Sequence, residues 1–406
     1  MEKENVIIII PFLSSGGAER AAINLAKNLK KEYNVRFVLF DASKNQYLYE
    51  KDIEIIDLGL TAQDNLLGKI KNTIKKIVRL KSIKKEYNIK FSISFLREPN
   101  FVNTFTRNKN ENTIISIRNK MSELDDSKVK KFMTRYAAKH ADNIVTLSKM
   151  VKYDQILEYS AEEKKVHVIY NACDIETIEG QAKEKIEEKN IMELFEKNKG
   201  KIVINIGRLT FQKGQWHLIR AFKKVVEKIP DAKLILLGKG EFKEKLEQLV
   251  ISCGLKNNVY LLGFFANPYK YLVKADVFAF SSQFEGLGNI ILEAMACKKP
   301  IISTDCMYGP REILAPGTDL KVQTKNIERA EYGILVPVCD SGIKMDNQEL
   351  SYEENIMADA IIELLSNKKE LEEYTKKSFE RITFFSMKRN KNEWIKVMKG
   401  ENKNNV

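Results

Sequence analysis

The sequence lacks several features that would place the protein outside the cytosol. Its five cysteines are scattered, their number is odd, and no two form a C-x-x-C pair. This pattern is typical of a reduced cytosolic protein and argues against a disulfide framework. No apolar run approaches the length needed to cross a bilayer. The amino terminus is charged and leads directly into a short apolar stretch, so we expect no signal peptide.

The composition is that of a globular protein with a basic surplus. The chain has 406 residues, of which 44% are hydrophobic, and this length suffices for two domains with a core each. The formal net charge is +13 at pH 7. We therefore expect an anionic partner or surface, and composition alone leaves nucleic acid, anionic lipid and nucleotide open.

Apolar runs of strand length alternate with helical stretches along the chain. In the first half these runs cover residues 6–12, 35–40, 91–95, 114–117, 144–147 and 166–170. In the second half they cover residues 202–206, 234–237, 259–262, 277–280, 300–304 and 334–336. Such strands predict an α/β fold whose parallel sheets are covered on both faces, and their number favours two sheets. We place the break in the charged stretch 174–200 and expect two or three helices from residue 352 on.

The segment 284–310 is the most informative part of the sequence. Glu285 and Glu293 are eight residues apart, and a Gly-Leu-Gly turn between them opens an apolar helix. Because apolar strands precede and follow this element, the first N–H groups of the helix should lie at the carboxyl end of a parallel sheet, where the helix dipole favours an anion. Carboxylates accept hydrogen bonds from hydroxyls, so two of them here indicate a phosphate that carries sugars.

This segment resembles the EX7E motif of retaining glycosyltransferases of the GT-B fold, family 4. Other segments resemble motifs of the same family: the GGxER loop at 15–20, the N-G-V-D turn at 171–174, the G-R-x4-K-G loop at 207–214, and the runs Gly-Pro-Arg-Glu-Ile at 309–313 and Gly-Ile-Leu-Val-Pro at 333–337. Each motif alone is weak, but their combined order and spacing from residue 15 to residue 337 are specific.

The resemblance implies a GT-B architecture. Two facing Rossmann-like domains with parallel sheets would hold the active site in the cleft between them, and a C-terminal helix would cross back to the first domain. We expect an acceptor-side domain over residues 1–175, a nucleotide-sugar-binding domain over residues 190–383, and the returning helix within residues 384–406.

The family's chemistry implies roles for several donor-site residues. Negative charge grows on the departing diphosphate, and fixed positive charge stabilises it. By resemblance, Arg208 and Lys213 supply this charge, together with backbone N–H groups of Gly288, Asn289 and Ile290. The implied donor is a UDP-linked nucleotide sugar, with no metal and no other cofactor. A solvated surface loop is the alternative for Arg208 and Lys213.

The two glutamates have separate implied roles. By resemblance, Glu293 accepts hydrogen bonds from the ribose hydroxyls, and Glu285 lies over the transferred sugar, where it holds the sugar or stabilises developing positive charge. Gly286 and Leu287 belong to the same donor-binding turn. Complementation of the helix dipole is an alternative for Glu285 alone.

Other donor-binding candidates follow predicted strands. Gly16 and Gly17 follow the first strand, where glycines let a backbone approach the donor phosphate closely; an ordinary turn is the alternative. Phe264 and Phe265 follow the strand at 259–262, near the place where the family holds the nucleotide base; core packing is their alternative.

One position departs from the family pattern. Many members have a histidine after the fourth strand of the first domain, in contact with the donor sugar. Here Arg118 and Asn119 stand at that place, and the only histidines are His140, His167 and His217. We predict that Arg118 or Asn119 replaces the histidine and binds the sugar or an acceptor phosphate. A histidine general base is then not expected, and the donor phosphate itself can take the acceptor proton.

A basic segment at 66–85 contains eight Lys or Arg residues and no acid. Its apolar residues fall within one helical stripe: Leu67, Ile70, Ile74, Ile77 and Val78. Its basic residues are expected to point away from that stripe: Lys69, Lys71, Lys75, Lys76 and Arg79. One interpretation is a crossover helix with a solvated basic face. We favour a second, in which Lys71, Lys75 and Arg79 meet anionic lipid or the diphosphate of a lipid-linked acceptor, because a soluble face usually includes Glu.

The predicted function is retaining transfer of a hexose or N-acetylhexosamine from a UDP-sugar to a polyprenyl-diphosphate-linked sugar. The enzyme would act at the cytoplasmic face of the plasma membrane, in the synthesis of capsule, O-antigen or another surface glycan. A teichoic-acid α-glucosyltransferase is the alternative.

Two other classes of protein fit less well. A dinucleotide oxidoreductase needs G-x-G-x-x-G, but Lys243 stands at the third glycine position after Gly238 and Gly240. A nucleic-acid-binding protein needs aromatic residues among the basic ones, and the segment 66–85 has none. We therefore expect no nucleic-acid partner.

Overall fold

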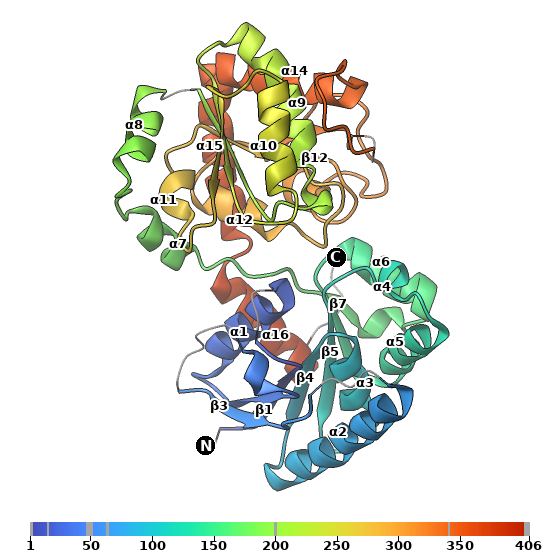
Figure 1. Ribbon diagram of the computed structural model, residues 1–406. Coiled ribbons are helices and arrows are strands. Elements are labelled where there is room, and N and C mark those ends of the chain that lie inside the picture. The colour runs from blue at the N-terminus through green and yellow to red at the C-terminus, as the bar shows by residue number, and fades with distance from the viewer. Residues whose placement is uncertain are drawn as a thin grey trace. The chain divides into compact units, whose positions relative to one another are not determined.

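The computed structural model describes residues 3–13, 16–45, 52–61, 65–198, 201–339 and 342–401, and only the backbone of Leu66. The chain divides into two compact units (Figure 1). Unit 1 consists of Met1–Ala172 with Met387–Val406, and unit 2 consists of Cys173–Ser386. The charged stretch 174–200 therefore belongs to unit 2, and the last helix belongs to unit 1.

Unit 1 is built on a seven-stranded parallel sheet with the order β3-β2-β1-β4-β5-β6-β7. The strands are β1 (Asn5–Ile10), β2 (Asn34–Leu39), β3 (Glu54–Asp57), β4 (Phe91–Phe95), β5 (Asn112–Ile117), β6 (Asn143–Thr146) and β7 (Val166–Val168). All but β3 match predicted apolar runs. β3 has the sequence Glu-Ile-Ile-Asp and pairs on one side only, so it carries the polar residues that an edge strand tolerates.

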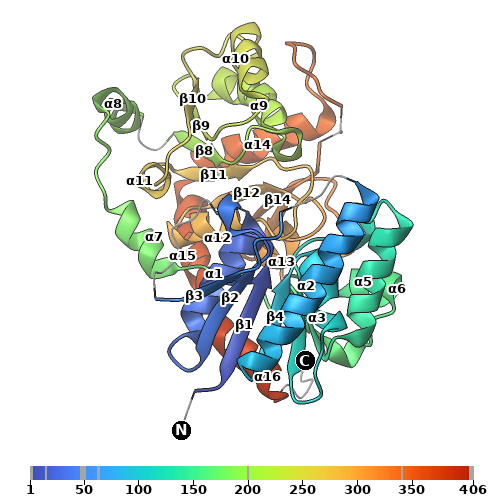
Figure 2. The ribbon, with the colours of Figure 1, turned by 60° about the horizontal axis from the view of Figure 1, so that its bottom comes forward.

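Helices cover both faces of this sheet. They are α1 (Gly17–Leu29), α2 (Leu66–Glu86), α3 (Arg97–Phe105), α4 (Met121–Leu124), α5 (Lys128–His140), α6 (Lys149–Tyr159) and α16 (Met387–Lys399), with short 3₁₀ turns at Ala42–Lys44 and Glu163–Lys165. Alternate residues of β1 face opposite ways: Val6 and Ile8 pack with Trp394 of α16, whereas Ile7 packs with Leu80 of α2. Figure 2 shows α2 and α3 on the face opposite α16.

Unit 2 is built on a second seven-stranded sheet with the order β10-β9-β8-β11-β12-β14-β13. The strands are β8 (Ile202–Ile206), β9 (Lys233–Leu237), β10 (Val259–Gly263), β11 (Val277–Phe280), β12 (Ile301–Thr304), β13 (Glu328–Ala330) and β14 (Gly333–Val336). Every pairing is parallel except that of the short edge strand β13 with β14. β13 is the second strand outside the predicted runs, and like β3 it lies at a sheet edge.

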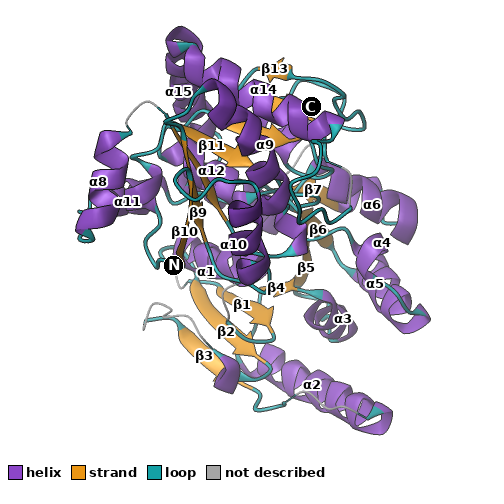
Figure 3. Cartoon of the chain, turned by 45° about the horizontal axis from the view of Figure 1, so that its top comes forward, coloured by secondary structure: helices purple, strands orange, loops and turns teal. Residues whose placement is uncertain are grey.

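The helices of unit 2 complete a Rossmann-like α/β arrangement (Figure 3). They are α7 (Ile175–Ala182), α8 (Lys189–Lys197), α9 (Gln215–Lys228), α10 (Lys243–Ser252), α11 (Tyr269–Leu272), α12 (Asn289–Ala296), α13 (Pro310–Leu314), α14 (Tyr352–Ser366) and α15 (Lys368–Thr383), with a 3₁₀ turn at Phe211–Lys213. With α16, the last two helices confirm the prediction of two or three helices after residue 352. The two parallel-sheet units confirm the predicted α/β fold.

Two sequence-level features have clear structural outcomes. All five cysteines are buried and none forms a disulfide. In the part of the chain that the structure describes, no helix is both long and apolar enough to span a bilayer.

Candidate functional site

Two loops of unit 2 meet at one edge of its sheet. β8 and β11 are parallel neighbours, so the loop 207–214 after β8 and the loop 281–288 after β11 emerge side by side. The backbone N–H of Gln283 donates to the Gln212 carbonyl over 2.8 Å, and Ser281 Oγ donates to the Lys213 carbonyl over 2.9 Å. Gln212 Nε2 also donates to the Phe284 carbonyl over 3.0 Å. These bonds fix the two loops to each other.

Glycine is required at two points of this edge. Gly214 has φ +57°, and a Cβ there would lie 2.3 Å from the Ser281 carbonyl oxygen. Gly238, after β9, has φ +154°, and its Cβ would lie 1.8 Å from the Gly207 carbonyl oxygen. Any side chain would force these segments apart, so the glycines hold the loops at their observed separation.

The close approach of the loops brings together Lys213 and Glu285. Lys213 Nζ donates to Glu285 Oε1 over 2.5 Å, and the two side chains are only 16% and 9% exposed. The ammonium also lies 5.3 Å from the Phe280 ring centroid. Lys213 is thus mostly buried, unlike a residue of a solvated surface loop. A partly buried cation beside a carboxylate can hold an anionic ligand next to a hydroxyl-bearing one.

Arg208 lies on the outer side of the same loop. Its side chain is exposed, and Nη2 contacts Gln212 Oε1 at 3.4 Å. Its carbonyl accepts a hydrogen bond from Gln215 Nε2 over 3.0 Å, which holds the backbone while the guanidinium extends outward. The structure therefore places Arg208 and Lys213 on one loop, with only Lys213 in contact with Glu285.

The predicted anion-binding helix is α12. Gly288 is its N-cap with φ +85°, Asn289 and Ile290 are its first residues, and Glu293 lies one turn further on. The first N–H groups of a helix have no acceptor within the helix, so this end can bind an anion. Leu287 is buried, and only its backbone can face a ligand.

The Leu287 backbone also supports a neighbouring turn. A Cβ at Gly309, which has φ +112°, would lie 2.0 Å from the Leu287 carbonyl oxygen. Glycine at position 309 therefore lets the segment that leads into α13 lie against the turn 286–288.

Several groups near these loops were not singled out from the sequence. Ser282 Oγ, Thr210 Oγ1 and Gln283 Nε2 are buried polar atoms with no hydrogen-bond partner among the described residues. Such atoms are uncommon in folded proteins and mark places where a ligand or water can bind. Burial raises the pKa of the Cys306 thiol, and the negative charge of Glu285 raises it further. Lys213 has the opposite, smaller effect on this pKa. No local motif signals these residues.

Phe264 and Phe265 differ from each other. Phe264 is 63% exposed, and Lys239 Nζ lies 4.9 Å from its ring centroid. Core packing is therefore wrong for Phe264, whose exposed ring lies beside Lys239 after the carboxyl ends of β10 and β9. Phe265 is partly buried and packs against Tyr271, with ring centroids 4.4 Å apart.

In unit 1, Gly16 and Gly17 begin α1. Gly16 is the N-cap with φ −77°, so a left-handed backbone does not explain the glycine. A Cβ on Gly16 would lie 2.2 Å from Glu19 Oε2, so the side chain of Glu19 folds back over the helix start. Ser15, the first residue of the matching motif, lies outside the described residues.

Arg118 and Asn119 follow β5 and differ in burial. Asn119 is exposed, whereas Arg118 is buried and lies over the rings of Phe95 and Trp394. Arg118 Nη1 donates to Asn171 Oδ1 over 2.9 Å, and Arg118 Nε donates to Ser116 Oγ over 2.7 Å. No carboxylate lies within ion-pair distance of it in the described ranges, and burial lowers the pKa of Arg118 to about 9. It remains a cation at neutral pH, and an anion would stabilise it.

The helix α2 corrects a prediction about the basic segment. Its packed face consists of Asn72, Lys76, Leu80, Ile83 and Lys84. Lys76 is buried, with Nζ 2.6 Å from Glu98 Oε1, so the prediction that it belongs to a solvated or lipid-facing basic side is wrong. The predicted apolar stripe is instead largely outward: Leu67, Ile70, Ile74 and Val78 are 73%, 50%, 54% and 63% exposed.

The other predicted cations of α2 lie on its outer side. Lys71, Lys75 and Arg79 are exposed, and Arg79 donates a hydrogen bond to the Leu58 carbonyl. The outer surface of α2 is therefore apolar and basic at once.

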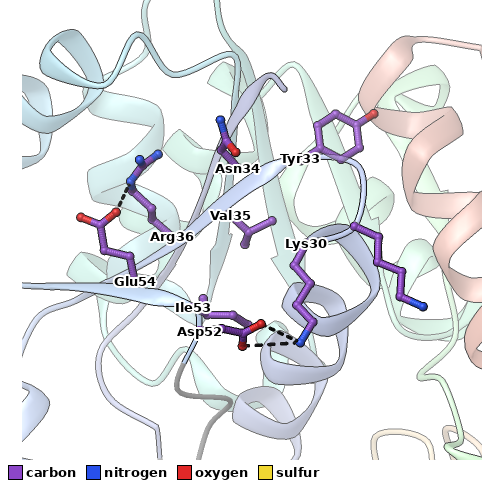
Figure 4. A pocket seen from close by; sticks show the side chains of 9 residues that line it. Lys30, Tyr33, Asn34, Val35, Arg36, Asp52, Ile53 and Glu54 are labelled. Carbon is purple, nitrogen blue, oxygen red and sulfur yellow. Dashed lines mark hydrogen bonds and ion pairs between the residues drawn. The ribbon is translucent and has the colours of Figure 1, made fainter. Parts of the chain in front are cut away.

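A cavity of about 400 Å³ lies beside the amino ends of strands of the unit 1 sheet (Figure 4). It is lined by residues at the amino ends of β2 and β3, where Arg36 pairs with Glu54 and Lys30 pairs with Asp52. Gly16 and Arg118 follow the carboxyl ends of their strands. The cavity is therefore not part of the predicted site. Within the described ranges, no cluster of three or more His, Cys, Asp or Glu side chains could hold a metal ion.

Comparison with known proteins places these features in a family. The model of the family "Glycosyl transferases group 1" matches residues 186–335, which include both loops of the site. An N-acetylgalactosamine-N,N'-diacetylbacillosaminyl-diphospho-undecaprenol 4-alpha-N-acetylgalactosaminyltransferase of Campylobacter jejuni is 32% identical over 339 residues, 82% of this chain and 85% of that protein. An uncharacterized glycosyltransferase of Methanocaldococcus jannaschii is 38% identical over 269 residues, 66% of this chain and 65% of that protein.

The fold has a close counterpart among solved structures. Anabaena HepE in complex with UDP superposes with a TM-score of 0.75 at 18% identity, covering 98% of this chain and all of that one. At this identity the likeness concerns the fold, which is GT-B. Given the extent of the match to the Campylobacter enzyme and the family model, this chain belongs to the glycosyl transferases group 1 family and is a glycosyltransferase.

Proposed function

We propose that this protein is a retaining glycosyltransferase that moves a hexose or N-acetylhexosamine from a UDP-sugar to a sugar on a polyprenyl diphosphate. It works without a metal ion at the cytoplasmic face of the membrane, in surface polysaccharide or glycan synthesis. The observation that carries the proposal is the contact between Lys213 and Glu285, which belong to different motifs and meet at 2.5 Å beside the start of α12.

In the donor complex, Lys213 exchanges part of its contact with Glu285 for the diphosphate. The ammonium and the first N–H groups of α12 then stabilise the negative charge that grows as the sugar leaves. Arg208 extends outward from the same loop and adds a second, bidentate contact to the phosphate. Because hydrogen bonds fix the backbones of the two loops to each other before the donor binds, Lys213 and the start of α12 need little reorganisation during the reaction.

The carboxylates act on the sugar parts of the donor. Glu285 lies next to the diphosphate site and holds the transferred sugar as it becomes cation-like. Glu293, one turn into α12, binds the ribose hydroxyls. Phe264 and Lys239 offer a stacking surface at the carboxyl ends of β10 and β9, which suits the uracil base. The acceptor hydroxyl attacks from the side of the leaving group, and the donor phosphate takes its proton.

Arg118 and the basic side of α2 serve the acceptor. Among the described residues, buried Arg118 contacts neutral groups and aromatic rings, so it can receive an acceptor phosphate or a sugar hydroxyl. Exposed Lys71 and Lys75 favour the acceptor diphosphate and the anionic membrane surface. The name of the Campylobacter relative, which describes a diphospho-undecaprenol substrate, supports this acceptor class.

The proposal is tested by a UDP-release screen across a panel of UDP-sugars. The acceptors are a polyprenyl-diphosphate sugar and, for the teichoic-acid alternative, poly(glycerol phosphate). We expect turnover with one UDP-sugar and the lipid-linked acceptor, an α-linkage in the product by NMR, and no loss of activity in EDTA. A β-linked product would exclude retention. Turnover only with poly(glycerol phosphate) would replace the proposed acceptor with the alternative.

A further inference from the structure

A second helix of unit 1 shares the unusual surface of α2. The helix α5 contains no Asp or Glu, and its exposed basic residues are Lys128, Lys131, Arg135 and Lys139. Among them, Val129 and Phe132 are 67% and 60% exposed. An outer helix face that combines cations with bare apolar side chains is costly in water unless something covers it.

Phe132 belongs to an aromatic cluster at the surface. Its ring centroid lies 6.4 Å from that of Phe101 and 6.1 Å from that of Tyr136. Phe105, at the end of α3, joins the cluster at 5.8 Å from Phe101 and is 51% exposed. The cluster therefore has a buried side that holds α3 against α5 and an open side that faces outward.

The two basic helices flank α3. Lys76 of α2 pairs with Glu98 at the start of α3, and the rings of α5 pack on Phe101 within α3. Figures 1 and 2 show α2, α3 and α5 in succession on one side of the unit 1 sheet. The exposed apolar residues of α2 and the aromatic cluster thus belong to the same side of unit 1.

We propose that α2 and α5 together bind the interface of an anionic bilayer, with the apolar residues of α2 and the cluster around Phe132 inserted among the lipids. This inference extends the proposed function, because an enzyme with a lipid-linked acceptor must reach a membrane. The notable point is the apolar contribution. Cations alone bind anionic lipid in a salt-sensitive manner, whereas inserted apolar and aromatic groups keep part of the binding at high salt.

Charge complementarity favours lipid over a second copy of the chain. A symmetric dimer through this side would place the cations of α2 and α5 against the same cations of the partner copy. An anionic bilayer neutralises those cations and buries the apolar groups at the same time. Aromatic rings beside basic residues are also typical of membrane–water interfaces.

The test uses sedimentation of the full chain with phosphatidylcholine vesicles, with and without phosphatidylglycerol, at low and high salt. One variant carries Ile70→Ser and Ile74→Ser on α2, and another carries Val129→Ser and Phe132→Ser on α5. The matched control is Ile251→Ser on α10 of unit 2, which is 55% exposed. We expect roughly tenfold weaker binding to anionic vesicles at high salt for each double variant and no change for the control.

Further measurements keep the result interpretable. Because Phe132 contacts other rings, Val129→Ser alone is measured as well, and thermal melting checks that each variant is folded. Equal pelleting of both double variants and the wild type at high salt would overturn the proposal, as would a dimer in analytical ultracentrifugation that the substitutions dissociate. UDP release without an acceptor should stay unchanged in the α5 variant. If the wild type releases no UDP from any UDP-sugar yet binds vesicles, the proposed function fails and this inference stands.

Discussion

The sequence pattern predicts the geometry of one basic segment, the loop 207–214, much better than that of another, the helix α2. In the loop, spacing translates directly into geometry: Lys213 and Glu285 are 72 residues apart and meet at 2.5 Å. In α2 the pattern defines two faces correctly but not which face packs. The residues that decide the matter, Glu98 and Glu111, lie on other parts of unit 1 and bind Lys76 and Lys84.

The difference has a physical cause. At Gly214 and Gly238 a positive φ coincides with a backbone contact that leaves no room for a Cβ, so these two residues specify the local backbone by themselves. The pattern of an amphipathic helix defines an apolar face and a polar face, but it does not decide alone which face packs against the domain. A lysine can lie on the buried face where a carboxylate and other hydrogen-bond acceptors contact it. Periodicity therefore predicts that α2 is a helix, but the face that packs is determined by residues elsewhere in unit 1, such as Glu98 and Glu111.

The largest expected effect tests the buried face of α2. Lys84 and Glu111 are fully buried and 2.7 Å apart, and burial lowers the pKa of Lys84. Lys84→Met leaves the Glu111 carboxylate without its cation, which should destabilise the fold by about 3–5 kcal/mol. The matched control is Lys85→Met, one residue along on the exposed side, which should change stability little. Urea unfolding measures both; equal stabilities would show that the pair contributes nothing.

The second prediction tests the loop. Lys213→Ala should lower turnover by about 10²-fold, or about 2.7 kcal/mol, because it removes a fixed cation from the leaving diphosphate. Arg208→Ala should act in the same direction. Lys243→Ala, an exposed lysine of α10, serves as the control and should keep wild-type kinetics. Steady-state UDP release measures the three variants, and wild-type turnover in Lys213→Ala would remove this residue from the donor site.

The third prediction separates the two glutamates. A ribose contact exists before and during the reaction, so Glu293→Gln should weaken UDP binding about tenfold and change kcat little. Glu285→Gln should chiefly lower kcat, because its contact strengthens as the sugar gains positive charge. Calorimetry with UDP and steady-state kinetics distinguish the two. Unchanged UDP affinity in Glu293→Gln would exclude the ribose role.

Much of the fold follows from the sequence, and the exceptions share a reason. The predicted apolar runs became strands because they are buried on both faces of parallel sheets. β3 and β13 escaped prediction because edge strands pair on one side and need little apolar patterning. At the site, turn glycines and charged motif residues are visible in the sequence. The burial of Ser282, Cys306 and Arg118 is not, because it depends on strands far away in the chain.

The smallest expected effect returns to the exposed side of α2. Lys71, Lys75 and Lys81 are exposed there, whereas Lys76 is paired inside and Arg79 is tied to the Leu58 carbonyl. Reversing Lys71, Lys75 and Lys81 to Glu tests their charge without removing a packed contact. Each cation near an anionic surface contributes about 1 kcal/mol at most, and salt screens part of it. The apparent KM for a lipid-diphosphate acceptor should therefore rise roughly threefold to tenfold at moderate salt.

A control of equal charge change makes this last result specific. Unit 2 has exposed lysines on α15, and reversing Lys368, Lys369 and Lys376 alters the net charge by the same amount. That variant should keep the wild-type KM, and both variants should bind UDP as the wild type does. If both triple variants raise KM equally, net charge and not a local contact explains the effect, because α2 and α15 belong to different units of the chain. If only the α2 variant does so, the exposed basic side of α2 acts locally on the lipid-linked acceptor.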